Sequence, residues 1–480
     1  MLQVTGGQRL GYLTMAALLS LLIGAKTMAV LAAGPMAIER DALGYWNLSA
    51  GVLDGDLLML GQPVAYRTPM YPWLVAGVRY LAGANALQML VALQGILIVA
   101  TALVAGRLAA SISGRPAAFL GTLLTTSLGV AHVTYGRAVM TETLFTFLLM
   151  LHLQSCAGYA KHPSCWRGVG SALTLAICVL TRPIAMLLWI PDLLLIVWVA
   201  RQRSPTQGGT DVNWLRQLGQ VGVMGAVYVA CLLPWMLRND HLFGRPALTE
   251  FMGRNLWVVT FQDGAGADLP LPETHPARDL VRRVQSVSSA ADLRMTWPVS
   301  DALVASGLND AEADRLMLLV ARQSIEQHRV QFIAQTGRRL VNFWRCAATS
   351  LPEPAENERL LLEQTSWHYA LPLVPWLLEH RISRSVAGNM VMMVVLGLAL
   401  ASLLGNPHTR GLGLWCACTL AYFGFVTALF EIPNYRYRLV VEPLMATVVG
   451  AALALEFGRD PTRGEGHARS AGQDASNGSP

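Results

Sequence analysis

The chain has 480 residues, of which 53% are hydrophobic and 14% charged, and its mean hydropathy is +0.42. Apolar runs of about 20 residues recur, and a helix of that length spans about 30 Å of hydrocarbon, which excludes a chain of soluble domains. The period-two alternation of an outer-membrane barrel is not visible, so we expect an all-α polytopic membrane protein.

The net charge of +6 comes almost wholly from arginine, since Lys26 and Lys161 are the only lysines. The arginines lie beside apolar segments rather than in basic runs, so nucleic acid is not expected as a partner. A guanidinium can bind two phosphate oxygens at once, which favours anionic membrane lipids or a lipid-phosphate substrate.

The apolar runs predict a bundle of about 10–12 transmembrane helices. They lie at 11–33, 86–106, 116–135, 139–159, 168–182, 183–200, 218–236, 386–404, 411–429 and 437–457. The segments 168–182 and 183–200 could be divided differently, and 368–380 could dip into the membrane. Alternate short connections carry the basic residues, which predicts that these connections are cytoplasmic.

The topology divides the chain into four parts, with a first periplasmic loop at 34–85. These are an N-terminal transmembrane catalytic module (1–236), a periplasmic region (237–385), C-terminal transmembrane helices (386–457) and a disordered cytoplasmic tail (458–480). The region 237–385 is too long for a connector, and apolar residues near helical spacing in 311–347 predict a mostly helical layer.

Seven cysteines lie mostly within apolar segments and show no CxxC spacing, so neither a zinc site nor a disulfide framework is indicated. No A-x-A site follows the first apolar segment, which we therefore expect to be an uncleaved anchor.

The first polar cluster follows the first apolar segment and contains Glu39, Asp41 and Tyr45. Asp41 could act as a general base on a hydroxyl, or it could cap a helix at the membrane interface. Glu39 could raise the pKa of Asp41, or it could be a solvated neighbour.

The second cluster runs from Tyr66 to Pro72, where two prolines fix the backbone and tyrosines suit the headgroup layer. Arg67 could hold a phosphate, with Tyr71 beside it. Alternatively, the cluster is an aromatic turn with an arginine that extends to the interface.

Glu142 lies at the start of a transmembrane helix, where the helix dipole stabilises an anion. Capping by Thr141 and Glu142 explains this position without function. A second carboxylate facing Asp41 could instead orient a substrate or hold a divalent cation, with Asp41 and Glu142 as its ligands.

Two single arginines end other apolar segments. Arg182 lies between a helix end and Pro183 and could simply extend to the membrane boundary. Trp235 and Arg238 lie at another helix exit, and the pattern favours interface anchors for both.

The last cluster contains Tyr435, Arg436 and Arg438 at the entry to the final apolar helix, with Glu442 after it. Arg436 and Arg438 would point about 200° apart on a helix, so only one of them need contact a given ligand. Glu442 in the same helix indicates a buried polar cavity.

Together and in order, these clusters resemble the GT-C glycosyltransferases, specifically the dolichyl-phosphate-mannose protein mannosyltransferase and lipid A aminoarabinose-transferase group. The resemblance covers roughly residues 10–457. It is carried by Asp41 to Tyr45, Tyr66 to Pro72, Met140 to Phe145, Thr181 to Pro183, Pro234 to Asn239 and Arg436 to Arg438.

The resemblance implies an inverting glycosyltransferase that uses a polyprenyl-phosphate sugar, with Asp41 as the catalytic base. It carries an acidic site residue onto Glu142 and phosphate-binding residues onto Arg436 and Arg438, then Arg67 and Arg182. The acceptor would be a lipid, glycan or protein hydroxyl or phosphate on the periplasmic face of the bacterial inner membrane. A divalent cation is possible and no other cofactor is expected.

The chain departs from the family where Arg40 separates Glu39 from Asp41, and it lacks a sizeable C-terminal soluble domain. Two other functions remain open. A secondary transporter or lipid flippase would use charges near the bilayer midplane, and a noncatalytic subunit would use the polar clusters as anchors and caps.

Overall fold

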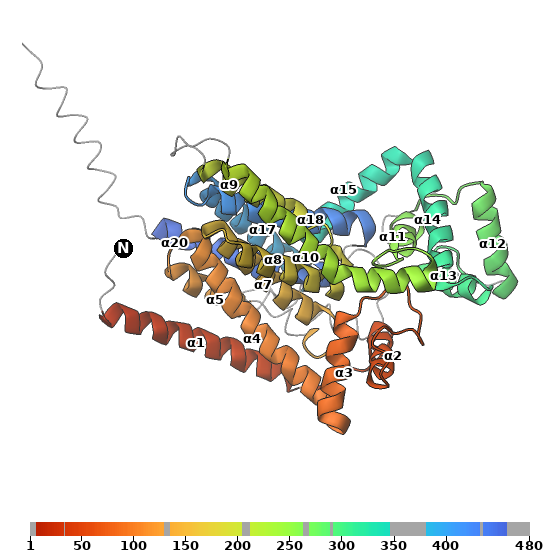
Figure 1. Cartoon of the computed structure of the whole chain (residues 1–480), viewed down its shortest axis with the longest axis horizontal. Coiled ribbons are helices and arrows are strands. Elements are labelled where there is room, and N and C mark those ends of the chain that lie inside the picture. Colours follow the sequence, from red (N-terminus) through yellow and green to blue (C-terminus); the bar gives the residue numbers. More distant parts are fainter. Residues whose placement is uncertain are drawn as a thin grey trace, which may run out of the picture.

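The computed structural model describes residues 6–32, 34–128, 135–203, 212–262, 268–288, 291–345, 381–432 and 435–457. The regular secondary structure within these ranges is helical, without a strand, and Figure 1 shows the helices as one elongated assembly. The expected dip at 368–380 and the tail at 458–480 lie outside the described residues.

The first half of the chain builds most of the bundle. Its helices are α1 (Gly6–Leu31), α2 (Asp41–Leu53), α3 (Met70–Ala82), α4 (Ala86–Ser113), α5 (Ala117–Leu128), α7 (Glu142–Lys161), α8 (Cys165–Thr181), α9 (Trp189–Arg203) and α10 (Val212–Phe243), with short 3-10 turns at Gly83–Asn85 and Pro183–Ala185.

The second half first forms a compact group of helices and then returns to the bundle. These helices are α11 (Met252–Phe261), α12 (His275–Val287), α13 (Thr296–Ala305), α14 (Asp310–Gln327), α15 (Arg329–Arg345), α17 (Arg381–Gly405), α18 (Arg410–Phe430), α19 (Tyr435–Leu439) and α20 (Glu442–Phe457).

Six helical stretches in the described ranges are long and apolar enough to cross a membrane. They are Leu10–Ala29, Met70–Ser113, Glu142–Lys161, Pro183–Arg201, Leu218–Phe243 and Arg410–Phe430. Shorter apolar helices lie at Ala117–Ser127, Cys165–Thr181 and Val391–Gly405. The chain is therefore an all-α, multi-pass membrane protein, as its composition predicts.

The last helix, α20, lies inside the bundle rather than at its edge. It is apolar on every side and nearly all of its residues are buried, as expected for a helix without a polar face. It packs against α4, α5 and α17, and Gly450 lies directly against Gly121 and Thr122 of α5. Small residues allow this close approach of two helix backbones.

A second hydrophobic core lies in the group α11 to α14, to the right of the bundle in Figure 1. Trp257, Leu280, Leu303 and Met317 are among its fully buried members. The helix α14 begins with a capping box in which Asn309 and Glu312 each bond the other's backbone N–H. This group occupies the middle of the chain, where the sequence predicts a mostly helical layer.

Candidate active site

Two carboxylates and three arginines from distant parts of the chain meet where α2, α7, α8 and α19 come together. They are Asp41, Glu142, Arg67, Arg182 and Arg436. Because the paired residues lie 26 to 395 positions apart in the sequence, only the folded bundle can bring the five side chains to one place.

Asp41 is the first residue of α2, and its side chain is 41% exposed. Arg67 Nη2 lies 3.2 Å from Asp41 Oδ1, and Arg436 Nη1 lies 3.1 Å from Asp41 Oδ2. Burial alone would raise the pKa of Asp41, but the charges of Arg436 and Arg67 outweigh it and lower this pKa below its ordinary value. Asp41 is therefore an ionised carboxylate that solvent can still reach.

Glu142 begins α7 and is completely buried. Its Oε1 atom accepts from Arg182 Nη1 at 2.8 Å and also from Arg436 Nε. A buried carboxylate is costly unless it is paired, and two guanidinium groups supply that pairing here.

The second oxygen of Glu142, Oε2, has no hydrogen-bond partner among the residues that the structure describes. Glu142 lines a cavity of about 10 Å³ together with Thr101, Thr143 and Thr146. Such a volume is about that of one water molecule.

Arg67 is held in place by aromatic rings and by one glycine. Its guanidinium carbon lies 4.1 Å from the centre of the Tyr45 ring and 5.3 Å from that of Tyr66. A Cβ atom at Gly44 would lie 2.7 Å from Arg67 Nη2. The glycine three residues after Asp41 therefore leaves the space that the guanidinium occupies.

Tyr71 supports the site from behind and is fully buried. Its ring meets that of Tyr45 edge-on at 5.2 Å, and its hydroxyl donates to Gln94 Oε1 at 3.2 Å. The Gln94 amide donates in turn to the carbonyl oxygens of Gly136 and Ala138, just before α7. Tyr71 thereby connects the start of α3 to the segment that precedes Glu142.

The structure does not bring two other candidates, Arg438 and Glu39, into this cluster. Arg438 is fully buried and donates to the carbonyl oxygen of Trp344 at 2.8 Å and to Glu442 at 3.2 Å. Glu39 is exposed, and its carbonyl oxygen accepts from Ala42 at the start of α2. The side chain of Tyr435 lies outside the described residues, although its backbone begins α19.

Glu431 and Tyr437 extend the cluster, and the sequence motifs give them no role. Tyr437 Oη donates to Glu431 Oε2 at 2.9 Å, and Arg182 lies 5.9 Å from the centre of the Tyr437 ring. Burial raises the pKa of Glu431 to about 7, against the lowering effect of Tyr437, Arg436 and Arg182. Their positions within the last cluster were visible in the sequence, but their proximity to Arg182 was not.

Arg238 was expected to be an interface anchor, and the structure instead buries it. Its guanidinium donates to the carbonyl oxygens of Leu58, Met59 and Val64 at 2.8–3.2 Å. Arg238, near the end of α10, therefore holds in place the loop that contains Arg67. Since these acceptors are backbone atoms, no residue pattern in the loop could have indicated the contact.

The guanidinium of Arg436 binds both carboxylates, Asp41 and Glu142, with separate nitrogens. A divalent cation shared by the two carboxylates would have to take the place of this guanidinium. The cation assigned to Asp41 and Glu142 from the sequence thus remains a prediction.

No family model matches the chain, and no curated protein matches it. The structure is similar to solved structures of two GT-C glycosyltransferases, both with TM-scores below 0.5. The Archaeoglobus fulgidus oligosaccharyltransferase AglB, described in complex with an inhibitory peptide and a dolichol-phosphate, has a TM-score of 0.47 and 10% identity, covering 99% of this chain and 53% of AglB. Cupriavidus metallidurans ArnT bound to undecaprenyl phosphate has a TM-score of 0.37 and 14% identity, covering 92% of this chain and 78% of ArnT.

The chain therefore spans about half the length of AglB. At these TM-scores the similarity does not indicate a function for this chain.

Proposed function

We propose that the chain is a membrane-embedded inverting glycosyltransferase that moves a sugar from a polyprenyl-phosphate donor to an acceptor hydroxyl or phosphate. The observation that carries this proposal is the contact of Arg436 with both Asp41 and Glu142. It joins an accessible carboxylate to a group of three arginines at the end of membrane-spanning helices. Transfer of a sugar from a lipid phosphate requires both: a base for the acceptor and positive charge for the phosphate.

The arginines provide the phosphate side of the reaction. The leaving group is a phosphate on which negative charge develops as the bond to the sugar breaks, and charge-assisted hydrogen bonds from guanidinium groups stabilise it. Arg67 and Arg436 are the best placed, because both already bind an anion that is accessible to solvent, Asp41. The membrane-spanning helices around the site let a lipid chain stay in the bilayer while its head group reaches them.

Asp41 provides the acceptor side. Its carboxylate takes the proton of an acceptor hydroxyl as the hydroxyl oxygen attacks the anomeric carbon. The bond from that carbon to the new oxygen forms on the face opposite the bond to the phosphate, which breaks, so the configuration inverts. An acceptor phosphate would attack without this proton transfer.

Donor binding would also prepare Asp41 for this role. In the structure Arg67 and Arg436 lower the pKa of Asp41, which makes it a weak base. A phosphate that takes over hydrogen bonds from these guanidinium groups adds a negative charge nearby, and both effects raise the basicity of Asp41. The carboxylate would therefore gain basicity when the donor is in place.

The helices α11 to α14 are the proposed acceptor-recognition layer, because they contact the loop that carries Arg67. The backbone N–H of Ala65 donates to Asp310 Oδ2 at 2.7 Å, and Tyr66 stacks on Phe251 at 5.4 Å. An acceptor bound to this layer would lie close to Asp41. We propose that this face is periplasmic, since the basic connections lie at the other ends of the helices, and that the membrane is a bacterial inner membrane.

The test is the Asp41→Asn variant, reconstituted with a set of polyprenyl-phosphate sugars and with membrane extract as acceptor. Mass spectrometry of the released polyprenyl phosphate and of glycosylated products is the measurement. We expect turnover to fall by at least about 100-fold, the usual contribution of a general base, with the protein still folded.

Asp54→Asn is the matched control, because Asp54 is an exposed carboxylate at the other end of α2 and should leave turnover unchanged. Equal turnover in Asp41→Asn and wild type would overturn the base assignment. Donor or lipid movement across liposomes without any covalent product would favour the transporter or flippase instead.

A further inference from the structure

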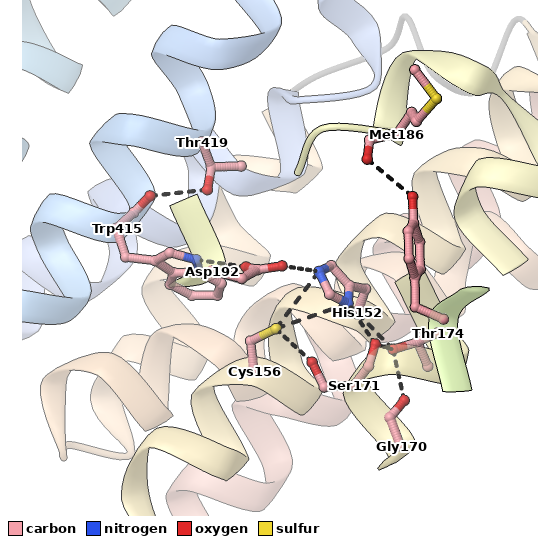
Figure 2. A network of polar contacts seen from close by, with 10 residues as sticks. His152, Cys156, Gly170, Ser171, Thr174, Met186, Asp192, Trp415 and Thr419 are labelled. Atoms are coloured by element: carbon pink, nitrogen blue, oxygen red, sulfur yellow. Dashed lines mark hydrogen bonds and ion pairs between the residues drawn. The ribbon is translucent and has the colours of Figure 1, made fainter. Parts of the chain in front are cut away.

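A second polar cluster lies inside the bundle, away from the candidate active site. His152 and Cys156 lie one turn apart on α7, and Asp192 lies in the first turn of α9. All three are buried, and His152 follows Glu142 by ten positions, which is about 15 Å along the helix. Figure 2 shows the three side chains turned toward one another between the helices.

The potential ligand atoms of this cluster are close together. His152 Nε2 lies 3.0 Å from Asp192 Oδ2, and Cys156 Sγ lies 3.6 Å from His152 Nε2. One ligand atom from each residue lies within 4.8 Å of the other two. Bond lengths of about 2.0–2.3 Å to a tetrahedral zinc ion put its ligand atoms about 3.3–3.6 Å apart, so only small movements separate this arrangement from a metal site.

The surrounding hydrogen bonds hold each side chain with the relevant atom toward the centre of the cluster. His152 Nδ1 lies 3.2 Å from the carbonyl oxygen of Ser171, which can only accept, and 3.3 Å from Thr174 Oγ1, whose hydroxyl donates to backbone carbonyls, so both contacts suit the tautomer with a proton on Nδ1. His152 Nε2 then faces a carboxylate oxygen with its lone pair unless a proton or a metal ion lies between them. A ligating histidine commonly has its other N–H bound to a carbonyl in this way.

The other two residues are supported similarly. Trp415 Nε1 donates to the outer oxygen of Asp192, Oδ1, at 3.0 Å, which leaves Oδ2 for the cluster. Ser171 Oγ lies 2.9 Å from Cys156 Sγ and can donate to a thiolate. Such outer hydrogen bonds orient metal ligands and are typical of protein metal sites.

We propose that His152, Cys156 and Asp192 bind a divalent transition-metal ion of the zinc class. Thiolate, imidazole and carboxylate together suit Zn²⁺, whereas Mg²⁺ and Ca²⁺ prefer oxygen ligands alone. Binding displaces the thiol proton of Cys156, together with any proton held between His152 Nε2 and Asp192, and releases it to solvent. A thiolate and a carboxylate then neutralise the double charge of the ion, which suits the interior of a bundle.

The proposed ion would cross-link α7 to α9, and its outer hydrogen bonds reach α8 through Ser171 and α18 through Trp415. Glu142 begins α7 and Arg182 directly follows α8, so the cross-link would fix two helices that position residues of the candidate active site. The inference does not depend on the proposed glycosyl transfer.

The first measurement is the metal content of the full-length protein, purified in detergent without a metal-affinity step. After incubation with Zn²⁺ and removal of unbound metal, we expect one ion per chain in wild type and a loss of at least tenfold in Cys156→Ser and His152→Gln. Cys416→Ser is the matched control, because Cys416 is also buried in the bundle and lies outside the cluster. It should retain the metal.

The second measurement is the absorption spectrum of wild type loaded with Co²⁺, which needs no variant that might misfold. We expect a thiolate-to-cobalt charge-transfer band that Cys156→Ser removes and Cys416→Ser keeps. Wild-type protein that holds no stoichiometric Zn²⁺ and shows no such band would overturn the proposal and leave a histidine–aspartate ion pair. Equal metal content in Cys156→Ser and wild type would overturn it as well.

Discussion

Arg436 and Asp41 lie 395 positions apart in the sequence, and their side chains approach to 3.1 Å. One comes from the last part of the chain and the other from the first loop, so this contact forms only when both ends of the bundle are in place. The same guanidinium binds the buried Glu142. The contact is therefore both a structural link and the centre of the proposed chemistry.

The first prediction concerns the geometry of this guanidinium. Arg436→Lys keeps the positive charge but removes the planar fork that binds two carboxylates with separate nitrogens. We expect turnover to fall by about 100- to 1000-fold, as for loss of one charge-stabilising donor. Turnover with a polyprenyl-phosphate sugar checks this, and Arg322→Lys, on the exposed surface of α14, should behave as wild type.

The second prediction concerns Gly44. Gly44→Ala places a methyl group 2.7 Å from Arg67 Nη2, so the guanidinium must shift from its place beside Asp41. A misplacement of about 1 Å can reduce turnover by up to about 100-fold, and we expect a loss in that range.

Gly51→Ala is the matched control for this change. Gly51 lies in the same helix, and no atom lies within 4 Å of the place that an added methyl group would take, so turnover should be unchanged. A loss of turnover in both variants would point to the helix rather than to Arg67.

The third prediction concerns the pH dependence of stability. Glu431 has a pKa of about 7 in the folded chain and an ordinary value of 4.5, so the folded state binds more protons between these values. Its contribution to stability is therefore complete below about pH 4.5 and is lost as the pH rises through 7.

Glu431→Gln imitates the protonated acid and removes this loss. We expect the free energy of unfolding of the variant, relative to that of wild type, to increase between pH 5 and pH 8 by at most about 3 kcal/mol. Thermal unfolding at each pH measures it. Glu326→Gln, on the exposed face of α14, controls for the loss of one carboxylate. A stability difference for Glu431→Gln that does not change with pH would contradict the prediction.

The fourth prediction concerns the crossing of α5 and α20. A Cβ atom at Gly450 would lie 2.2 Å from Thr122 Oγ1 and 2.6 Å from the Thr122 backbone nitrogen, so Gly450→Ala forces the two helices apart. Overpacking of this kind costs about 1–3 kcal/mol or more. Thermal unfolding in detergent measures the loss, and Gly397→Ala in α17, with open space around it, should cause none.

The sequence predicts the helices well, because each expected apolar segment coincides with a helix where the structure describes it. It also places Asp41, Glu142 and Arg436 near one another, since all three lie at helix ends on one deduced face. That prediction needs only the lengths of the apolar segments and the direction of each crossing.

The sequence does not distinguish Arg436 from Arg438. Their spacing indicates that they point in different directions, but which of them faces Asp41 depends on how α19 is rotated against its neighbours. Arg438 instead forms a buried pair with Glu442. His152 and Asp192 were missed for a similar reason, because each is a single polar residue in an apolar segment and its partner lies on another helix.

The burial of α20 has a consequence for how the protein is made. Synthesis proceeds from the N-terminus, so α4 and α5 enter the membrane long before α20, which packs against both of them. Until that helix arrives, the surface around Gly121 and Thr122 faces lipid or the insertion machinery, and Glu142 lacks one of its two arginines. Assembly of the bundle and completion of the site are thus a single late event, and a chain that ends before residue 435 would have neither.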